Sequence, residues 1–119
     1  KAGIGPERVF LVGFSQGACL ALEFAARNPR RYGGVFALSG GLIGASVRAD
    51  NYSGSLAGTP VFLGCSDVDP HIPLARVKES SAAMAALGGT VTERIYPGMG
   101  HTVTGDEVEE IRKVLATVA

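Results

Sequence analysis

The sequence lacks an excess of charge of either sign. Its 11 Lys and Arg residues balance 11 Asp and Glu residues, so the formal net charge at neutral pH is zero. Nucleic acids and anionic membrane surfaces attract basic proteins. The composition therefore gives no electrostatic reason to expect either partner.

Long apolar runs are also missing. No stretch approaches the roughly 20 consecutive apolar residues that span a bilayer, and residues 1–7 lack the basic start and apolar core of a signal peptide. We therefore expect a soluble chain, for which the cytoplasm is the default localisation.

Cysteine is scarce, and its spacing does not suggest a metal site. The two cysteines, Cys19 and Cys65, each lie inside an apolar run, where cysteine behaves as a small core residue. We predict two free thiols, no metal and no cofactor.

The sequence contains enough apolar residues to form one hydrophobic core. Hydrophobic residues make up 46% of 119 positions, which predicts a single domain over residues 1–119. Short apolar runs rich in β-branched and aromatic residues predict buried strands at 8–12, 35–38 and 60–64, and a segment with alternating faces predicts a final strand at 90–96. The first of these is expected to end at Gly13.

Helix patterns stand between the predicted strands. A helix over 17–28, apolar on nearly all sides, is expected to be buried on most faces. A second helix begins after Pro73 and ends at Gly88 and Gly89. A third opens on a capping box formed by Thr104 and Glu107. Its expected buried stripe consists of Val108, Ile111, Leu115 and Val118.

Strands that are mostly continuously apolar alternate with helices along the chain. This pattern predicts an α/β fold, in which a parallel sheet is flanked by helices on both faces. Functional groups of such sheets gather at the carboxyl ends of the strands.

Ser15 stands at the first of these ends, in the segment Gly13-Phe14-Ser15-Gln16-Gly17. A G-x-S-x-G sequence between a strand and a helix is typical of a nucleophile elbow. Glycines at 13 and 17 would let strand and helix approach closely. The N–H of Gln16, at the start of the helix, would point at a developing oxyanion. The alternative is a glycine-rich turn whose serine caps the helix.

A serine nucleophile needs a base, and the chain has two histidines. His101 follows the last strand in the segment Y-P-G-M-G-H, at the same sheet edge as Ser15, and is the expected base. His71 lies beside an acidic loop, where it would be a solvated side chain or part of a substrate rim.

Two aspartates in the segment G-C-S-D-V-D-P could orient the base. Asp69 precedes Pro70, which favours an extended backbone there, and the helix start at Pro73 would fix the loop. Asp67 would more naturally cap the turn through its own backbone. The residues favour Asp69 and leave Asp67 open.

The segments GFSQG, GCSDVDPHIP and YPGMGH together resemble the three catalytic segments of the phospholipase/carboxylesterase branch of the α/β-hydrolases, which includes the acyl-protein thioesterases. The resemblance covers nearly the whole chain. It implies an α/β-hydrolase fold, a triad of Ser15, Asp69 and His101, and cleavage of carboxylic ester or thioester bonds. Leu42 and Ile43 would then suit a short to medium acyl chain, although both could equally be core residues.

Members of that family are about twice as long, so the chain resembles their carboxyl-terminal half, a partial domain. The loop that supplies the second oxyanion-hole N–H lies in the other half. We expect self-association, or an amino-terminal half, to cover the first strand, since an uncovered edge is an aggregation hazard. The alternative function is a catalytically incomplete fragment that binds a ligand or partner.

Overall fold

The computed structural model describes residues 5, 8–42, 54–67, 72–98 and 103–116. In chain order its elements are β1 (Phe10–Phe14), α1 (Gln16–Arg27), β2 (Gly34–Leu38), β3 (Pro60–Ser66), α2 (Leu74–Ala86), β4 (Thr90–Tyr96) and α3 (Gly105–Ala116).

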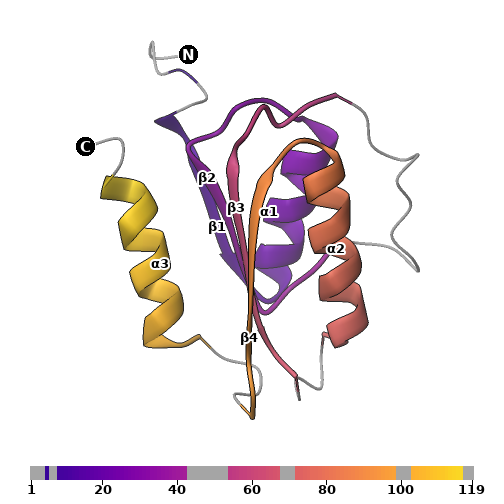
Figure 1. Ribbon diagram of the computed structural model, residues 1–119, viewed down its shortest axis with the longest axis vertical. Helices are drawn as coiled ribbons and strands as arrows, with labels where there is room; N and C mark the ends of the chain where they lie inside the picture. The colour runs from indigo at the N-terminus through magenta and orange to yellow at the C-terminus, as the bar shows by residue number, and fades with distance from the viewer. Residues whose placement is uncertain (1–4, 6–7, 43–53, 68–71, 99–102, 117–119) are drawn as a thin grey trace.

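The four strands form one parallel sheet in the order β1-β2-β3-β4. Figure 1 shows α1 and α2 on one face of this sheet and α3 on the other. Each strand thus lies beside the next one in the chain, and the predicted fold class is confirmed. β1 and β4 are the two edges of the sheet as described.

The core lies on both faces of the sheet. The larger cluster packs α1 and α2 onto the sheet through side chains such as Leu22, Leu63 and Met84. The smaller cluster, Phe36, Leu38 and Phe62, packs under α3. Burial on both faces explains why the two central strands, β2 and β3, are continuously apolar, while the edge strand β4 alternates between exposed and partly buried residues.

Both cysteines are free thiols, as predicted. Cys65 is buried in the larger core cluster, and Cys19 is partly buried on α1.

Two strand ends differ from the prediction. β1 runs through Gly13 to Phe14, because Gly13 keeps its ladder position opposite Ala37 of β2. β3 continues to Ser66, because β4 pairs with it as far as Tyr96. A strand ends where its neighbours stop pairing with it, and a glycine by itself does not end it.

The buried side of α3 was predicted wrongly in part. Val108 and Leu115 are 55% and 44% exposed, and Val118 lies outside the described residues. Ile111 packs partly buried toward the sheet, as predicted, and it is joined there by Val114 and by Glu107, which is fully buried.

Helix α1 also exposes more apolar surface than expected. Its buried residues are three alanines, Leu22 and Glu23, while Leu20 and Phe24 are 58% and 51% exposed. The helix therefore covers the sheet with one face, and its other face is apolar and open.

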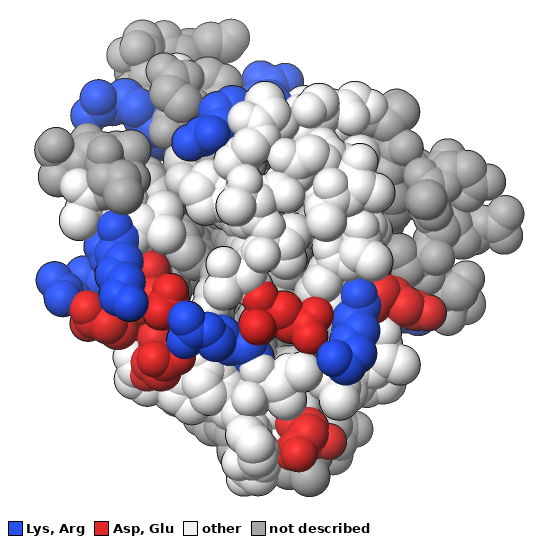
Figure 2. Space-filling view, viewed as in Figure 1, with Lys and Arg blue, Asp and Glu red and all other residues white. Residues whose placement is uncertain are grey.

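Charged side chains of both signs lie next to one another in a band across one face of the molecule (Figure 2). Arg94 of β4 contacts Asp106 and Glu110 of α3, and Lys78 of α2 contacts Glu93 of β4. This face therefore presents mixed charge. Among the helices that the structure describes, none combines the length and apolar character needed to traverse a bilayer.

Candidate active site

Polar residues follow the carboxyl ends of three of the parallel strands. Ser15 follows β1, Ser39 follows β2 and Asp67 follows β3. Two backbone hydrogen bonds extend the sheet into this edge, from Ser15 N to Leu38 O at 2.9 Å and from Ser39 N to Gly64 O at 2.7 Å. The structure thus places these three residues along one edge of the sheet. The other predicted residues, Ile43, Asp69, His71 and His101, lie outside the described residues.

Ser15 forms the turn between β1 and α1 in a conformation that non-glycine residues rarely adopt. Its φ is 58° and its ψ is −117°. Its carbonyl accepts the first helical hydrogen bond, from Cys19 N at 3.1 Å. The Ser15 side chain makes no capping hydrogen bond to the helix. Such strain persists only where the surroundings impose it, and it clusters at functional sites.

Two glycines make this turn possible. A Cβ on Gly13 would overlap the backbone of Gly17 and lie 2.6 Å from Ala18 N. A Cβ on Gly40, in the neighbouring loop after β2, would lie 2.8 Å from Ser15 O and 2.5 Å from the Cβ of Ala18. The turn at Ser15 therefore packs closely against Gly13 of β1 on one side and against Gly40 of the loop after β2 on the other.

Gly17 does not have the steric role predicted for it. Among the described residues, apart from its chain neighbours and the nearby backbone of its own helix, no atom lies within 4 Å of a Cβ placed on Gly17. Gly17 lies in the first turn of α1 and its missing side chain would point into open space, so the close approach is made by its backbone alone.

Gln16 is the first residue of α1. The N–H groups of a first helical turn have no carbonyl partner within the helix, and the helix dipole gives them a partial positive charge. This position can donate a hydrogen bond to an anionic oxygen near Ser15.

The turn that Asp67 was predicted to cap continues into residues 68–71, which lie outside the described residues, but the structure shows a longer-range bond of the Asp67 side chain. Its Oδ1 accepts a hydrogen bond of 3.0 Å from the N–H of Gly98, in the turn that follows β4. Gly98 has a φ of 72°, in the left-handed region that favours glycine. Asp67 therefore links the segment after β3 to the segment after β4.

The start of α3 is tied to β4 and capped as predicted. Thr104 N donates to Glu107 Oε1 at 2.8 Å, and Glu107 N donates to Thr104 Oγ1 at 3.2 Å, which is the predicted capping box. The Tyr96 hydroxyl donates to Asp106 Oδ2 at 2.6 Å. Burial, and then this bond to the Asp106 carboxylate, raise the pKa of Tyr96. The phenol is therefore a neutral donor at physiological pH.

Glu107 is an unexpected feature beside this box. Its carboxyl is fully buried, and within the described part of the chain its Oε2 has no hydrogen-bond partner. A Cβ on Gly64 of β3 would overlap Oε2, so the glycine makes room for the carboxyl. Burial raises the pKa of Glu107, and the nearby Asp106 adds to this effect, while hydrogen bonds from Thr104 oppose it. The capping box was visible in the sequence, but the burial of its glutamate was not.

Leu42 belongs to the main core. It is 2% exposed, and both its backbone groups are tied to α2, through Ser80 Oγ at 2.8 Å and Arg76 Nη1 at 3.0 Å. The structure thus places Leu42 in the packing role that the sequence left open beside substrate contact.

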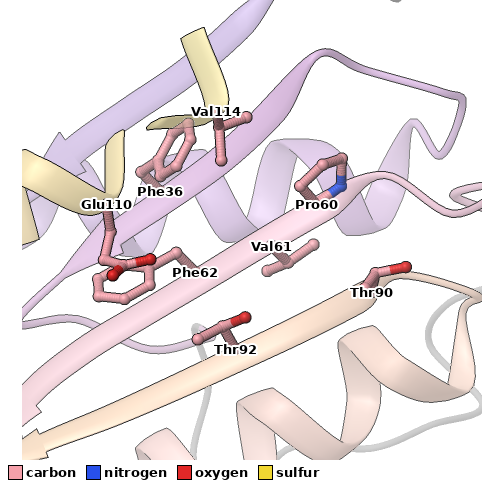
Figure 3. A pocket seen from close by; sticks show the side chains of 8 residues that line it. All are labelled: Phe36, Pro60, Val61, Phe62, Thr90, Thr92, Glu110 and Val114. Carbon is pink, nitrogen blue, oxygen red and sulfur yellow. The ribbon is translucent and has the colours of Figure 1, made fainter. Parts of the chain in front are cut away.

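A pocket of about 90 Å³ lies between the sheet and α3, far along the strands from Ser15. Figure 3 shows Phe36, Phe62 and Val114 around it, with Pro60 and Thr90 at one end. Pro60 and Thr90 begin β3 and β4. Because the strands are parallel, this pocket lies toward the amino ends of these strands, and Ser15 follows the carboxyl end of β1. The pocket is therefore separate from the candidate active site.

Known proteins similar to this chain are esterases and thioesterases. Residues 1–119 match the Phospholipase/Carboxylesterase family. Acyl-protein thioesterase 1 of Gibberella zeae is 35% identical over 116 residues, covering 96% of this chain and 49% of that protein. Acyl-protein thioesterase 1 of Saccharomyces cerevisiae is 33% identical over 112 residues, covering 92% of this chain and 49% of that protein.

A solved structure shares the fold closely. A phospholipase/carboxylesterase from Dyadobacter fermentans superposes with a TM-score of 0.91 at 43% identity, over 96% of this chain and 55% of that one. The chain thus spans about half the length of the relatives it matches. Because residues 1–119 match this family and the chain shares its fold with a phospholipase/carboxylesterase, the chain belongs to the phospholipase/carboxylesterase family.

Proposed function

We propose that this chain carries the nucleophile, base and acid of a serine hydrolase that cleaves carboxylic esters or thioesters. The observation that carries the proposal is the backbone of Ser15, held at φ 58° between a strand and a helix by the close contact of Gly13 with Gly17. This is the local geometry that a nucleophile elbow requires. Two of the relatives are named thioesterases, and a third is named a phospholipase/carboxylesterase.

The roles follow from the chemistry of acyl transfer. His101 takes the proton of Ser15 Oγ as the oxygen attacks the substrate carbonyl, and Asp69 holds the imidazole in the tautomer that accepts this proton. The N–H of Gln16 donates to the oxyanion of the tetrahedral intermediate. His101 then protonates the leaving alcohol or thiol. Water, deprotonated by His101, releases the acid from the acyl-enzyme and regenerates Ser15.

Gln16 alone is a weak oxyanion hole. Loss of one donor typically costs about 3 kcal/mol of transition-state stabilisation, or at least a hundredfold in rate. The chain spans about half of its relatives' length, and we propose that the complementary half supplies a second donor.

A fluorophosphonate probe tests the proposal directly. We expect intact mass measurement to show one adduct on the wild-type protein, and peptide mapping to place it on Ser15. Ser39 is an internal comparison, since it also has a positive φ at a strand end but is fully buried and should stay unlabelled.

The matched variants are Ser15→Ala, which should abolish the adduct, and His101→Ala, which should slow labelling by about 10³-fold or more, since the nucleophile then lacks its base. Absence of an adduct on well-folded wild-type protein would contradict the proposal for this chain, and so would an adduct that survives Ser15→Ala.

A second candidate function, partner binding without turnover, is favoured by the exposed apolar surface around β1. Val12 and Phe14 on this edge strand are 54% and 42% exposed, and Leu20 and Phe24 on α1 are also exposed. We propose that a polypeptide equivalent to the other half of the relatives pairs with β1 and covers these side chains.

Light scattering checks whether this surface associates. We expect the isolated chain at micromolar concentration to form dimers or larger species through β1, because an uncovered apolar edge strand pairs readily with another chain. Replacing Val12 by lysine places a charge on the edge and should return the chain to a monomer. A monomeric wild-type chain at that concentration would be the opposite result and would remove the basis for this interface.

A further inference from the structure

The bond between Asp67 and Gly98 lies where two neighbouring chain segments leave the sheet. β3 and β4 pair in register up to Ser66 and Tyr96. Asp67 is the first residue beyond this last pair on β3, and Gly98 is the second residue beyond it on β4. The bond of 3.0 Å between Asp67 Oδ1 and Gly98 N therefore joins the two segments after the backbone ladder has ended.

These two segments carry the proposed acid and base. Asp69 follows Asp67 by two residues, and His101 follows Gly98 by three. An ionised carboxylate only accepts hydrogen bonds, and a bond from a backbone N–H to a charged acceptor is stronger than one between neutral groups. The bond thus fixes the starting points of both loops relative to each other.

Asp67 has the surroundings of a positioning group and not of a triad acid. A triad aspartate is buried and bonds to the imidazole N–H. Asp67 is exposed, and one of its oxygens bonds to the backbone of Gly98.

The segment between Gly98 and α3 is anchored at its far end as well. The capping box of Thr104 and Glu107 holds the start of α3, and the Tyr96 hydroxyl bonds to Asp106. Asp67 supplies the anchor at the near end of the segment that carries His101.

We infer that Asp67 is a positioning residue, which sets the loop bearing His101 against the loop bearing Asp69 through the Gly98 N–H. The inference rests on the proposed function of His101 and Asp69. It assigns the two aspartates of the segment G-C-S-D-V-D-P to different tasks.

Substitution by asparagine separates the two tasks, because its side-chain carbonyl can still accept the Gly98 N–H but carries no charge. We expect the fluorophosphonate labelling rate of Asp67→Asn to stay within about 3-fold of wild type. Asp67→Ala should lose about 10- to 100-fold, the cost of a small misplacement of catalytic groups. Asp69→Asn should lose about 10⁴-fold, as expected when an amide replaces a triad acid. Glu109→Gln, an exposed charge change on α3, is the control.

Two rate results would overturn the inference. If Asp67→Asn loses as much activity as Asp67→Ala and approaches the loss expected for a triad acid, Asp67 is the triad acid. If Asp67→Ala labels as fast as wild type, the bond positions nothing that the reaction uses.

Amide hydrogen exchange at Gly98 tests the bond without any activity. We expect the Gly98 N–H to be protected in wild type and Asp67→Asn, and to exchange at least about 10-fold faster in Asp67→Ala. Equal exchange rates in all three proteins would overturn the inference. An unreactive wild-type protein would count against the proposed function, while this exchange measurement would still test the bond between Asp67 and Gly98.

Discussion

Replacing Gly13 by alanine is expected to destabilise the chain by more than about 3 kcal/mol, the upper end of the cost of inserting a methyl group into a close-packed site. The new Cβ would overlap the carbonyl group of Gly17 and lie 2.6 Å from Ala18 N. These are backbone atoms, so no side-chain rotation relieves the overlap, and β1 and α1 would have to move apart. Against a total stability of about 5 to 15 kcal/mol, this is a large loss.

Gly17→Ala is the matched control, because it adds the same methyl group four residues away. In the described part of the chain, apart from the nearby backbone of α1 itself and the chain neighbours, nothing lies within 4 Å of that methyl group, and alanine favours helix. We expect Gly17→Ala to leave stability unchanged or raise it by up to about 1 kcal/mol. Urea denaturation followed by circular dichroism measures both variants. Equal losses at the two positions would show that the turn at Ser15 does not depend on the space at Gly13.

The second large effect concerns the pH dependence of stability at Glu107. Burial raises the pKa of Glu107 in the folded chain above its unfolded value. The folded chain therefore keeps a proton that the unfolded chain releases. The contribution of this group to stability is fully present below the unfolded pKa and is lost as the pH rises through the folded pKa.

Glu107→Gln should remove this loss, since glutamine is always neutral and keeps an oxygen for Thr104 N. We expect the variant and wild type to be similar near pH 4, and the variant to be more stable above pH 7 by about 1 kcal/mol or more, because an ionised buried group costs more than a neutral one. Denaturation curves between about pH 4 and 9 measure the difference.

Glu109→Gln on the same helix provides a control of opposite sign. The side-chain bond to Arg112 lowers the pKa of Glu109, whose side chain is about half exposed to solvent. Its small contribution is present above the unfolded pKa and is lost as the pH falls, so the variant should be slightly less stable at neutral pH.

The prediction for Glu107 has a clear opposite result. If the difference in unfolding free energy between wild type and Glu107→Gln were the same at every pH, the Glu107 carboxyl would not change its charge on folding.

Local patterns predicted much of this molecule correctly. The alternation of strands and helices, the bounds of β4, and the capping box at Thr104 and Glu107 depend on neighbours within a few residues. Propensity, period and capping act over that range, so they can be recognised in the sequence. The tight turn at Ser15 was also predicted from its glycines, one of which, Gly13, has the predicted steric role.

The errors lie where distant segments meet. Whether Val108 or Glu107 faces the sheet depends on how α3 sits over Phe36 and Phe62, and the helix period alone allows both. Similarly, β1 continues through Gly13 because β2 offers it a partner in Ala37.

Residues close together in the chain were enough to predict the order of elements, the position of Ser15 after a strand and the family segments. The contact of Asp67 with Gly98, 31 residues away, and the position of the Glu107 carboxyl beside Gly64 depend on the packed fold. Both contacts form because β3 and β4 are neighbours in the sheet and α3 packs onto it. Partners brought together in this way leave no local pattern from which they could be predicted.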